Sequence, residues 1–203
     1  MSAAAEVLVV ATGVANLASV EAGLRRAGAR ARITEDAAAV TDAERVVLPG
    51  VGAFAAGIER LRALDLVDTL RARIAADRPT LAVCLGLQLL GEGSDESPEC
   101  EGLGVLAARA TRFGEGVRVP QLGWNRVTPD AGCRTLAAGF AYFANSYRLA
   151  DAPAGWGVAW ADHGGRFVAG LERGNVLACQ FHPELSGRFG HELLCRWLEG
   201  TAC

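Results

Sequence analysis

The 203-residue chain has no C-x-x-C pair, no long apolar run and no excess of basic residues. Its six cysteines stand alone in the sequence, which argues against a zinc site and against a thioredoxin-like redox centre. In a cytosolic protein such cysteines are mostly reduced thiols. The sequence therefore predicts no metal site and no cofactor.

Membrane, secretory and nucleic-acid signals are missing as well. The apolar runs stop well short of the roughly 20 residues that a membrane helix needs. The opening MSAAAEVLVVATG lacks the basic start and long apolar core of a secretory signal. A net charge of -3, with arginines spread along the chain, leaves no basic patch for phosphates. We expect a cytoplasmic protein that binds neither membrane nor nucleic acid.

Length and composition fit one compact domain over residues 1–203, with 51% hydrophobic and 21% charged residues. Apolar strand-like segments at 7–11, 31–34, 45–48 and 80–83 alternate with amphipathic helical segments, the first from about 16 to 27 and the last ending near 76. This rhythm predicts an α/β fold with a mostly parallel, doubly wound sheet flanked by helices.

The second half of the chain has a different pattern. Residues 91–104 are rich in Gly, Ser, Glu and Pro and are predicted to form a solvent loop. Short aromatic-containing segments with many turn signals follow, and they predict additional antiparallel strands. Residues 186–198 predict a closing helix with Ser186 as its N-cap.

Cys84 lies where the predicted strand 80–83 runs directly into an apolar helix. A cysteine at such a turn is lifted out of the sheet, and the helix N-terminus favours its thiolate. Those are the requirements for a nucleophile. The alternative is a buried cysteine that only fills space, like the other five.

A glycine-rich segment, Pro49-Gly50-Val51-Gly52, follows the strand at 45–48. Its glycines tolerate positive φ, so the segment can turn a backbone N–H toward an oxyanion. An ordinary strand-to-helix turn would have the same composition.

The segment Gln180-Phe181-His182-Pro183-Glu184 supplies a base and a carboxylate separated by one proline. A thiol nucleophile needs an imidazole to take its proton, and the imidazole needs a carboxylate to fix its tautomer. The other two histidines, His163 and His191, lie in polar surroundings and are predicted to be surface residues.

The segment Ala82-Val83-Cys84-Leu85-Gly86-Leu87-Gln88, together with His182-Pro183-Glu184, resembles the G-x-C-x-G-x-Q and H-P-E motifs of the class I (triad) glutamine amidotransferases. Within that family the chain is most similar to the HisH-type glutaminase subunits of imidazole glycerol phosphate synthase, from about residue 13 to 198. The further matching segments are Pro49-Gly50-Val51-Gly52-Ala53-Phe54, Gly123-Trp124-Asn125, Tyr142-Phe143 and Ser146-Tyr147.

The resemblance implies hydrolysis of L-glutamine through a thioester on Cys84, with His182 as acid and base and Glu184 as its support. It also implies an oxyanion hole formed by the N–H groups of Val51 and Leu85. The expected partner is a (β/α)8-barrel cyclase subunit (HisF-like), which receives the ammonia as half of a heterodimer. The implied glutamine-binding residues are Gly50, Gly52, Gly86, Gln88, Asn145, Ser146 and Tyr147, and the implied partner-interface residues are Asn16, Gln121, Trp124, Asn125 and Leu185.

Several positions depart from the family pattern. The family has Asp-Tyr-Gly-x-Gly-Asn where this chain has Ala-Thr-Gly-Val-Ala-Asn at 11–16, histidines in place of Gln121 and Asn145, and lysine in place of Leu185. These departures keep other hypotheses open: a paralogue that feeds a different ammonia acceptor, in specialised metabolism or surface-sugar amidation, or a scaffold or regulatory binder with little turnover. A different cysteine hydrolase on a related fold is a further alternative.

Overall fold

The structure is a computed structural model that describes residues 4–13 and 16–200. Its helices are α1 (Leu17–Arg26), α2 (Ala37–Asp42), α3 (Phe54–Ala63), α4 (Leu66–Ala75), α5 (Leu85–Leu89), the 3-10 helix η1 (Pro183–Leu185) and α6 (Gly187–Gly200). Its strands are β1 (Glu6–Val10), β2 (Arg30–Thr34), β3 (Arg45–Leu48), β4 (Thr80–Val83), β5 (Gly93–Ser94), β6 (Ser97–Glu101), β7 (Arg109–Arg112), β8 (Gln121–Pro129), β9 (Gly139–Asn145), β10 (Tyr147–Leu149), β11 (Gly157–Asp162), β12 (Arg166–Arg173) and β13 (Val176–Cys179).

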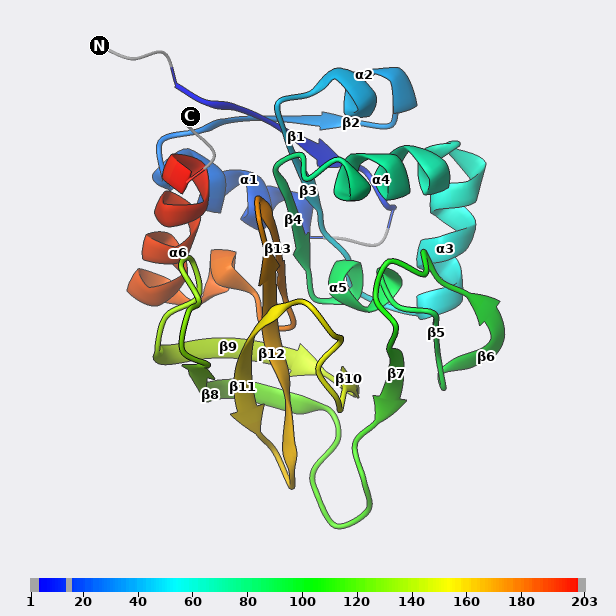
Figure 1. Cartoon of the computed structure of the whole chain (residues 1–203), viewed down its shortest axis with the longest axis vertical. Coiled ribbons are helices and arrows are strands. Elements are labelled where there is room, and N and C mark those ends of the chain that lie inside the picture. Colours follow the sequence, from blue (N-terminus) through cyan, green and yellow to red (C-terminus); the bar gives the residue numbers. More distant parts are fainter. Residues whose placement is uncertain (1–3, 14–15, 201–203) are drawn as a thin grey trace.

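A nine-stranded mixed sheet runs through the molecule in the order β2-β1-β3-β4-β13-β12-β11-β8-β9 (Figure 1). The first five strands of this order are parallel, and the remaining four are antiparallel. The predicted α/β class, a largely parallel helix-flanked sheet with added antiparallel strands, is confirmed. The predicted strand positions at 45–48 and 80–83 coincide with β3 and β4.

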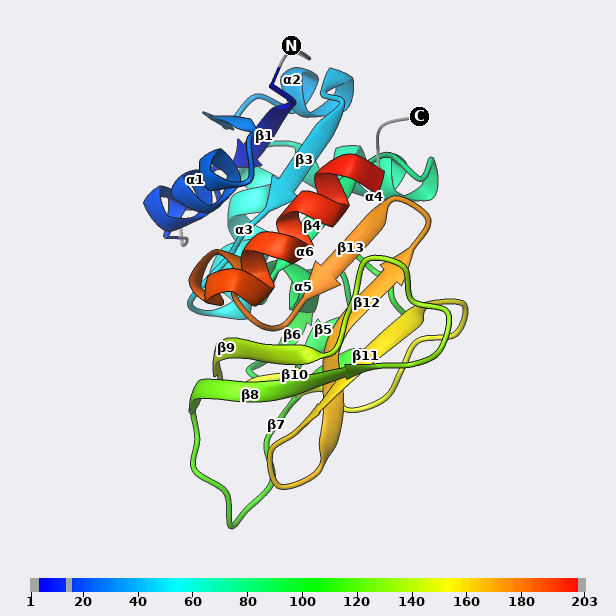
Figure 2. The same ribbon diagram turned by 90° about the vertical axis from the view of Figure 1, so that its left-hand side faces the viewer.

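The inner parallel strands β1, β3, β4 and β13 are apolar on both faces because helices cover both. In β1, Val7 and Val9 pack in one cluster with residues of α1 and α6, whereas Leu8 and Val10 pack in another with residues of α2, α3 and α4. Successive side chains of a strand point to opposite faces, so this alternation produces two separate cores. Figure 2 shows α1 and α6 on one side of the strands and α3 and α4 on the other.

The prediction of a solvent loop over 91–104 is wrong in part. Two short strands, β5 and β6, form there and join β7 and β10 in a four-stranded sheet of order β10-β7-β5-β6. Gly, Ser and Pro are depleted in strands, so composition alone indicated a loop. The backbone hydrogen bonds of β5 are made with β7, which lies later in the chain, so the composition of residues 91–104 alone could not predict them.

Ser186 holds the predicted N-cap position, since its carbonyl oxygen accepts from the Gly190 N–H at 3.1 Å, but its hydroxyl bonds to other segments. Its hydroxyl donates to the His182 carbonyl oxygen at 2.6 Å and accepts from the Tyr142 N–H at 2.9 Å. The helix itself, α6, begins at Gly187, directly after the predicted N-cap residue. Within the described ranges, no helix is long and apolar enough to cross a membrane.

Three neighbouring parallel strands, β3, β4 and β13, end at the same edge of the sheet. Leu48 of β3 is in register with Ala82 of β4, and Val83 of β4 with Cys179 of β13. The segments after these strands therefore meet at one place, where open α/β sheets bind their ligands. These are the segments that begin at Pro49, Cys84 and Gln180.

Candidate active site

Cys84 occupies a strained turn between β4 and α5. Its φ is +54° and its ψ is -106°, an unusual conformation for a residue with a side chain. The Cys84 N–H donates to the Cys179 carbonyl oxygen at 2.7 Å, which anchors the turn to β13. The side chain is 5% exposed, so its sulfur faces a nearly enclosed site at the start of a helix.

Two glycines let the backbone segments around Cys84 approach closely. A Cβ atom on Gly86 would lie 2.1 Å from the Leu48 carbonyl oxygen, and one on Gly50 would lie 2.9 Å from the Leu85 Cβ. Neither glycine has a positive φ, so close packing is what requires them. Gly86 and Gly50, implied above as glutamine-binding residues, set the distance between β3 and α5.

His182 lies between Glu184 and Cys84. Its Nδ1 is 2.9 Å from the Glu184 Oε1, and Cys84 is close enough to raise the pKa of the ring. A carboxylate accepts hydrogen bonds, so Nδ1 carries a proton and Nε2 is left to face the sulfur. The structure thus brings together the three residues that sequence motifs indicated.

The environment of His182 favours its charged form. Burial lowers the pKa of the imidazole, but hydrogen bonds and charges from Cys84 and Glu184 outweigh that effect and raise the pKa to about 10. An imidazolium at neutral pH is the form of histidine found beside the thiol in cysteine hydrolases that pair the two residues. The imidazolium can then donate a proton to a leaving group.

Backbone contacts hold this pair in place. The His182 N–H donates to the Tyr142 carbonyl oxygen of β9 at 2.9 Å, and Arg26 of α1 donates to the Glu184 carbonyl oxygen at 3.1 Å. Together with the Ser186 hydroxyl, these bonds connect η1 to β9 and α1. The imidazole position is therefore determined by three elements distant in sequence.

A cavity of about 360 Å³ opens beside Cys84. It is lined by seven of the residues that the resemblance implied for glutamine or oxyanion binding: Val51, Gly52, Leu85, Gln88, Asn145, Ser146 and Tyr147. The other lining residues are Ala53, Cys84, Glu96 and Ala144. The volume suits a small amino-acid ligand better than a nucleotide.

The implied oxyanion donors are not both available in this conformation. The Leu85 N–H donates to the Gly50 carbonyl oxygen at 3.2 Å, so a protein oxygen occupies the place of an oxyanion. Val51 is 39% exposed at the cavity mouth. A rotation of the peptide between Gly50 and Val51 would withdraw that carbonyl and turn the Val51 N–H inward.

Sequence reasoning missed Glu96 and Gln180. Glu96, in the predicted loop, contributes a carboxylate to the cavity wall, and its Oε2 accepts from the Phe54 N–H at 2.7 Å. Gln180 is completely buried, and its Nε2 lies 3.6 Å from the Cys84 sulfur. Position next to the H-P-E motif was the only sequence signal for Gln180, and Glu96 had none.

The residues implied for a partner interface differ in their exposure and in their hydrogen bonds. Trp124 is 59% exposed and Leu185 is 42% exposed, and Asn16 caps α1, accepting from the Ser19 N–H. Asn125 instead donates to the Asp162 carbonyl oxygen at 2.7 Å. Residues 14 and 15, part of the divergent segment 11–16, lie outside the described residues.

Gln121, also implied for the interface, is buried and pairs directly with Asn145 across β8 and β9. The two family histidines that are absent here would therefore have been cross-strand neighbours. In the described part of the chain, neither Gln121 Oε1 nor Asn145 Oδ1 has a hydrogen-bond partner. Directly paired residues lie on the same face of a sheet. Gln121 and Asn145 therefore replace the two family histidines at one place on that face.

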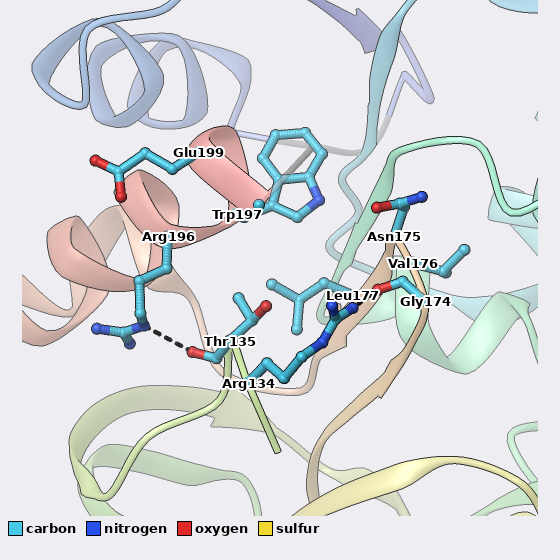
Figure 3. Close-up of a pocket in the computed structure, with 10 residues that line it drawn as sticks. Arg134, Thr135, Gly174, Asn175, Val176, Leu177, Arg196, Trp197 and Glu199 are labelled. Carbon is cyan, nitrogen blue, oxygen red and sulfur yellow. Dashed lines mark hydrogen bonds between the residues drawn. The ribbon is translucent and has the colours of Figure 1, made fainter. Parts of the chain in front are cut away.

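A second hollow of about 380 Å³ lies at the opposite end of β13 and is remote from Cys84 (Figure 3). Arg196 donates from Nε to the Thr135 carbonyl oxygen there, at 2.9 Å. Among the residues that the structure describes, no cysteine or histidine lines it. Within residues 4–13 and 16–200, no three His, Cys, Asp or Glu side chains gather closely enough to hold a metal ion.

Comparison with known proteins agrees with this geometry. The family model for class-I glutamine amidotransferases matches residues 13–199. The imidazole glycerol phosphate synthase subunit HisH of Symbiobacterium thermophilum is 41% identical over 198 residues, covering 95% of this chain and 93% of that protein. The protein of the same name from Escherichia coli K12 is 36% identical and covers 95% and 98%.

Solved structures show the same fold at lower identity. A crystal structure of a glutamine amidotransferase has a TM-score of 0.78 and 23% identity, covering 97% of this chain and 99% of that one. A glutamine amidotransferase from Thermotoga maritima has a TM-score of 0.62 and 18% identity, with 96% and 81% covered.

Proposed function

The chain belongs to the class-I glutamine amidotransferase family, and from that premise we propose that it is the glutaminase subunit that supplies ammonia for imidazole glycerol phosphate synthesis. The observation that supports the pathway assignment is the 41% identity to a HisH subunit over nearly the full length of both chains. The names of these relatives support an assignment to histidine biosynthesis. We expect the second subunit of the heterodimer to be a (β/α)8-barrel cyclase (HisF-like).

The first chemical step is attack of the Cys84 thiolate on the amide carbon of glutamine. A sulfur–carbon bond forms, and the carbonyl oxygen becomes an oxyanion. His182, held as imidazolium by Glu184, then donates its Nε2 proton to the amide nitrogen. The carbon–nitrogen bond breaks, ammonia leaves, and a γ-glutamyl thioester remains on Cys84.

The second step reverses these roles. His182, now neutral, takes a proton from water, and the resulting hydroxide attacks the thioester carbon. Glutamate leaves, the sulfur departs as a thiolate, and His182 is again an imidazolium. The buried Glu184 carboxylate fixes the ring orientation throughout, because Nδ1 remains bonded to Oε1.

Stabilisation of the oxyanion requires a change in the segment Pro49-Gly50-Val51-Gly52. Rotation of one peptide unit would free the Leu85 N–H from the Gly50 carbonyl oxygen and replace that oxygen with the Val51 N–H. Two N–H donors would then face the oxyanion. Gly50, which has no Cβ, provides backbone freedom on one side of this peptide. The resting conformation is therefore a low-activity state.

The cavity is suited to the amino-acid end of glutamine. Glu96 can pair with the α-ammonium group, whereas Gln88 and the backbone of residues 145–147 can bond the rest of the substrate. Ser146 and Tyr147 line the same cavity as Val51 and Gly52 of the glycine-rich segment.

An exposed apolar surface adjoins this cavity and supports docking of the cyclase subunit there. Leu122, Trp124 and Phe140 are 63%, 59% and 59% exposed, and the register of β8 and β9 places them on one face. Ala144, which lines the cavity, is the cross-strand neighbour of Leu122. Ammonia leaving Cys84 would therefore emerge beside the docking surface, where transfer without loss to solvent is possible.

The proposed pathway is tested by reconstitution with the barrel subunit from the same organism. Glutamate release should rise by about 100-fold or more when the barrel protein is added together with its nucleotide substrate, and imidazole glycerol phosphate should form from glutamine. A paralogue for another acceptor, the alternative suggested by Gln121, Asn145 and Leu185, predicts glutaminase activity without such stimulation. Rescue of a histidine auxotroph would contradict that alternative.

Replacement of Trp124 by alanine should weaken binding of the barrel subunit by about 30-fold or more, because large aromatic residues dominate protein interfaces. The midpoint of thermal unfolding should change little, since this side chain is mostly exposed. Titration calorimetry measures the affinity. Ile33→Ala is the matched control, because Ile33 is 43% exposed on the edge strand β2, at the far end of the sheet. Equal affinity of both variants would place the docking surface elsewhere.

A further inference from the structure

Gln180 is a fully buried polar residue that the mechanism above leaves without a role. It follows β13 and precedes Phe181, and its backbone N–H donates to the Ala169 carbonyl oxygen at 2.8 Å. Its side-chain Nε2 lies 3.6 Å from the Cys84 sulfur, and its Oε1 accepts from Gln88 at 3.0 Å. The amide therefore lies between the nucleophile and the glutamine cavity.

The orientation of this amide follows from a chain of hydrogen bonds that starts at a backbone carbonyl. The Tyr147 carbonyl oxygen can only accept, and it is 3.0 Å from both Asn145 Nδ2 and Gln88 Nε2. Gln88 therefore presents its NH2 group to Tyr147, and the second hydrogen of that group is available to Gln180 Oε1. The Gln180 nitrogen is consequently the end that faces sulfur.

An N–H group directed at sulfur favours the anionic form, because a thiolate accepts hydrogen bonds more strongly than a thiol. His182 is the ionisable group beside Cys84 and is itself bonded to Glu184, while Glu96 and Tyr147 line the same cavity. His182 changes its charge during the reaction. Gln180 stays neutral, so it can hold the sulfur both before and after His182 has given up its proton.

We propose that Gln180 is a further catalytic residue, which donates a hydrogen bond to the Cys84 sulfur, stabilises its thiolate and couples it to the glutamine cavity through Gln88. This proposal rests on the proposed role of Cys84 as the nucleophile. Contact between substrate and Gln88 would tighten the chain Tyr147–Gln88–Gln180–Cys84 and align the sulfur. A bound glutamine would thereby help to activate the group that attacks it.

The test compares Gln180→Met with Gln180→Glu in the full chain. Methionine fills a similar volume without an N–H donor. Glutamate keeps the shape and the acceptor for Gln88 but places an oxygen next to the sulfur. Alkylation of Cys84 by iodoacetamide is measured peptide by peptide across pH, with Cys100, a half-buried cysteine of β6, as internal reference.

In Gln180→Met the midpoint of Cys84 alkylation should move upward by about one pH unit, and kcat for glutaminase should fall about 10-fold. Gln180→Glu should shift the midpoint at least as far, because its carboxylate repels a thiolate. The rate at Cys100 should be the same in all three proteins. Thermal unfolding identifies any variant that fails to fold. The alkylation profile of the other variant then tests the role of Gln180.

An unchanged Cys84 profile in a folded variant would overturn the proposal, even if kcat falls, because a packing role alone lowers turnover without moving the profile. Alkylation needs no turnover. If the wild-type protein released no glutamate from glutamine, the proposed function would fail, while the shift in Cys84 reactivity would still decide the role of Gln180.

Discussion

Replacement of Cys84 by alanine is expected to lower glutamine hydrolysis by about 10⁴-fold or more, because the sulfur beside His182 is removed and no thioester can form. Glutamate release is measured with and without the barrel subunit. Cys100→Ala is the matched control: Cys100 lies on β6, outside the cavity, and its loss should leave the rate unchanged. A Cys84→Ala protein that retains substantial hydrolysis would exclude the proposed mechanism.

The same variant tests the electrostatics of the site. Cys84 contributes both a hydrogen bond and a charge that raise the pKa of His182, whereas burial lowers it and Glu184 continues to raise it. Without the sulfur, the pKa should therefore fall from its wild-type value of about 10. Chemical shifts of the labelled imidazole across pH measure the change. An unchanged titration would mean that His182 and Cys84 do not interact.

The parallel half of the fold was predictable because local signals agreed. Strands β3 and β4 are short, continuous apolar runs bounded by Pro and Gly, which is typical of strands covered on both faces. Each is followed by a chemically distinctive segment. Parallel strands place their carboxyl ends at one edge, so the meeting of these segments follows from topology.

The features that were not predictable depend on contacts between distant segments. Glu96 enters the cavity because β5 pairs with β7, and the Ser186 hydroxyl turns away from α6 because Tyr142 and His182 provide its partners. Gln180 acquires its orientation from Tyr147 through Gln88. No local composition or spacing encodes these bonds, since each depends on how the sheet is assembled.

Replacement of Gly86 by alanine is expected to lower glutaminase activity by about 100-fold or more and the free energy of unfolding by about 3 kcal/mol. The new Cβ would lie 2.1 Å from the Leu48 carbonyl oxygen, whereas carbon–oxygen contacts normally exceed about 3.3 Å. The obstacle is backbone of a central strand, so it cannot rotate away. Helix α5 would have to move by about 1 Å.

Such a movement would act directly on the nucleophile, because Cys84 is the residue immediately before α5 and its φ of +54° is held by that junction. Activity assays and denaturant unfolding measure the two effects. Gly114→Ala is the matched control, since its Cβ would meet no atom within 4 Å and its φ is not positive. If Gly86→Ala behaved like that control, the close approach of β3 and α5 would not be what positions Cys84. A joint loss of activity and stability in Gly86→Ala, absent from Gly114→Ala, would support a role of the glycine of the G-x-C-x-G-x-Q motif in bringing the two elements together.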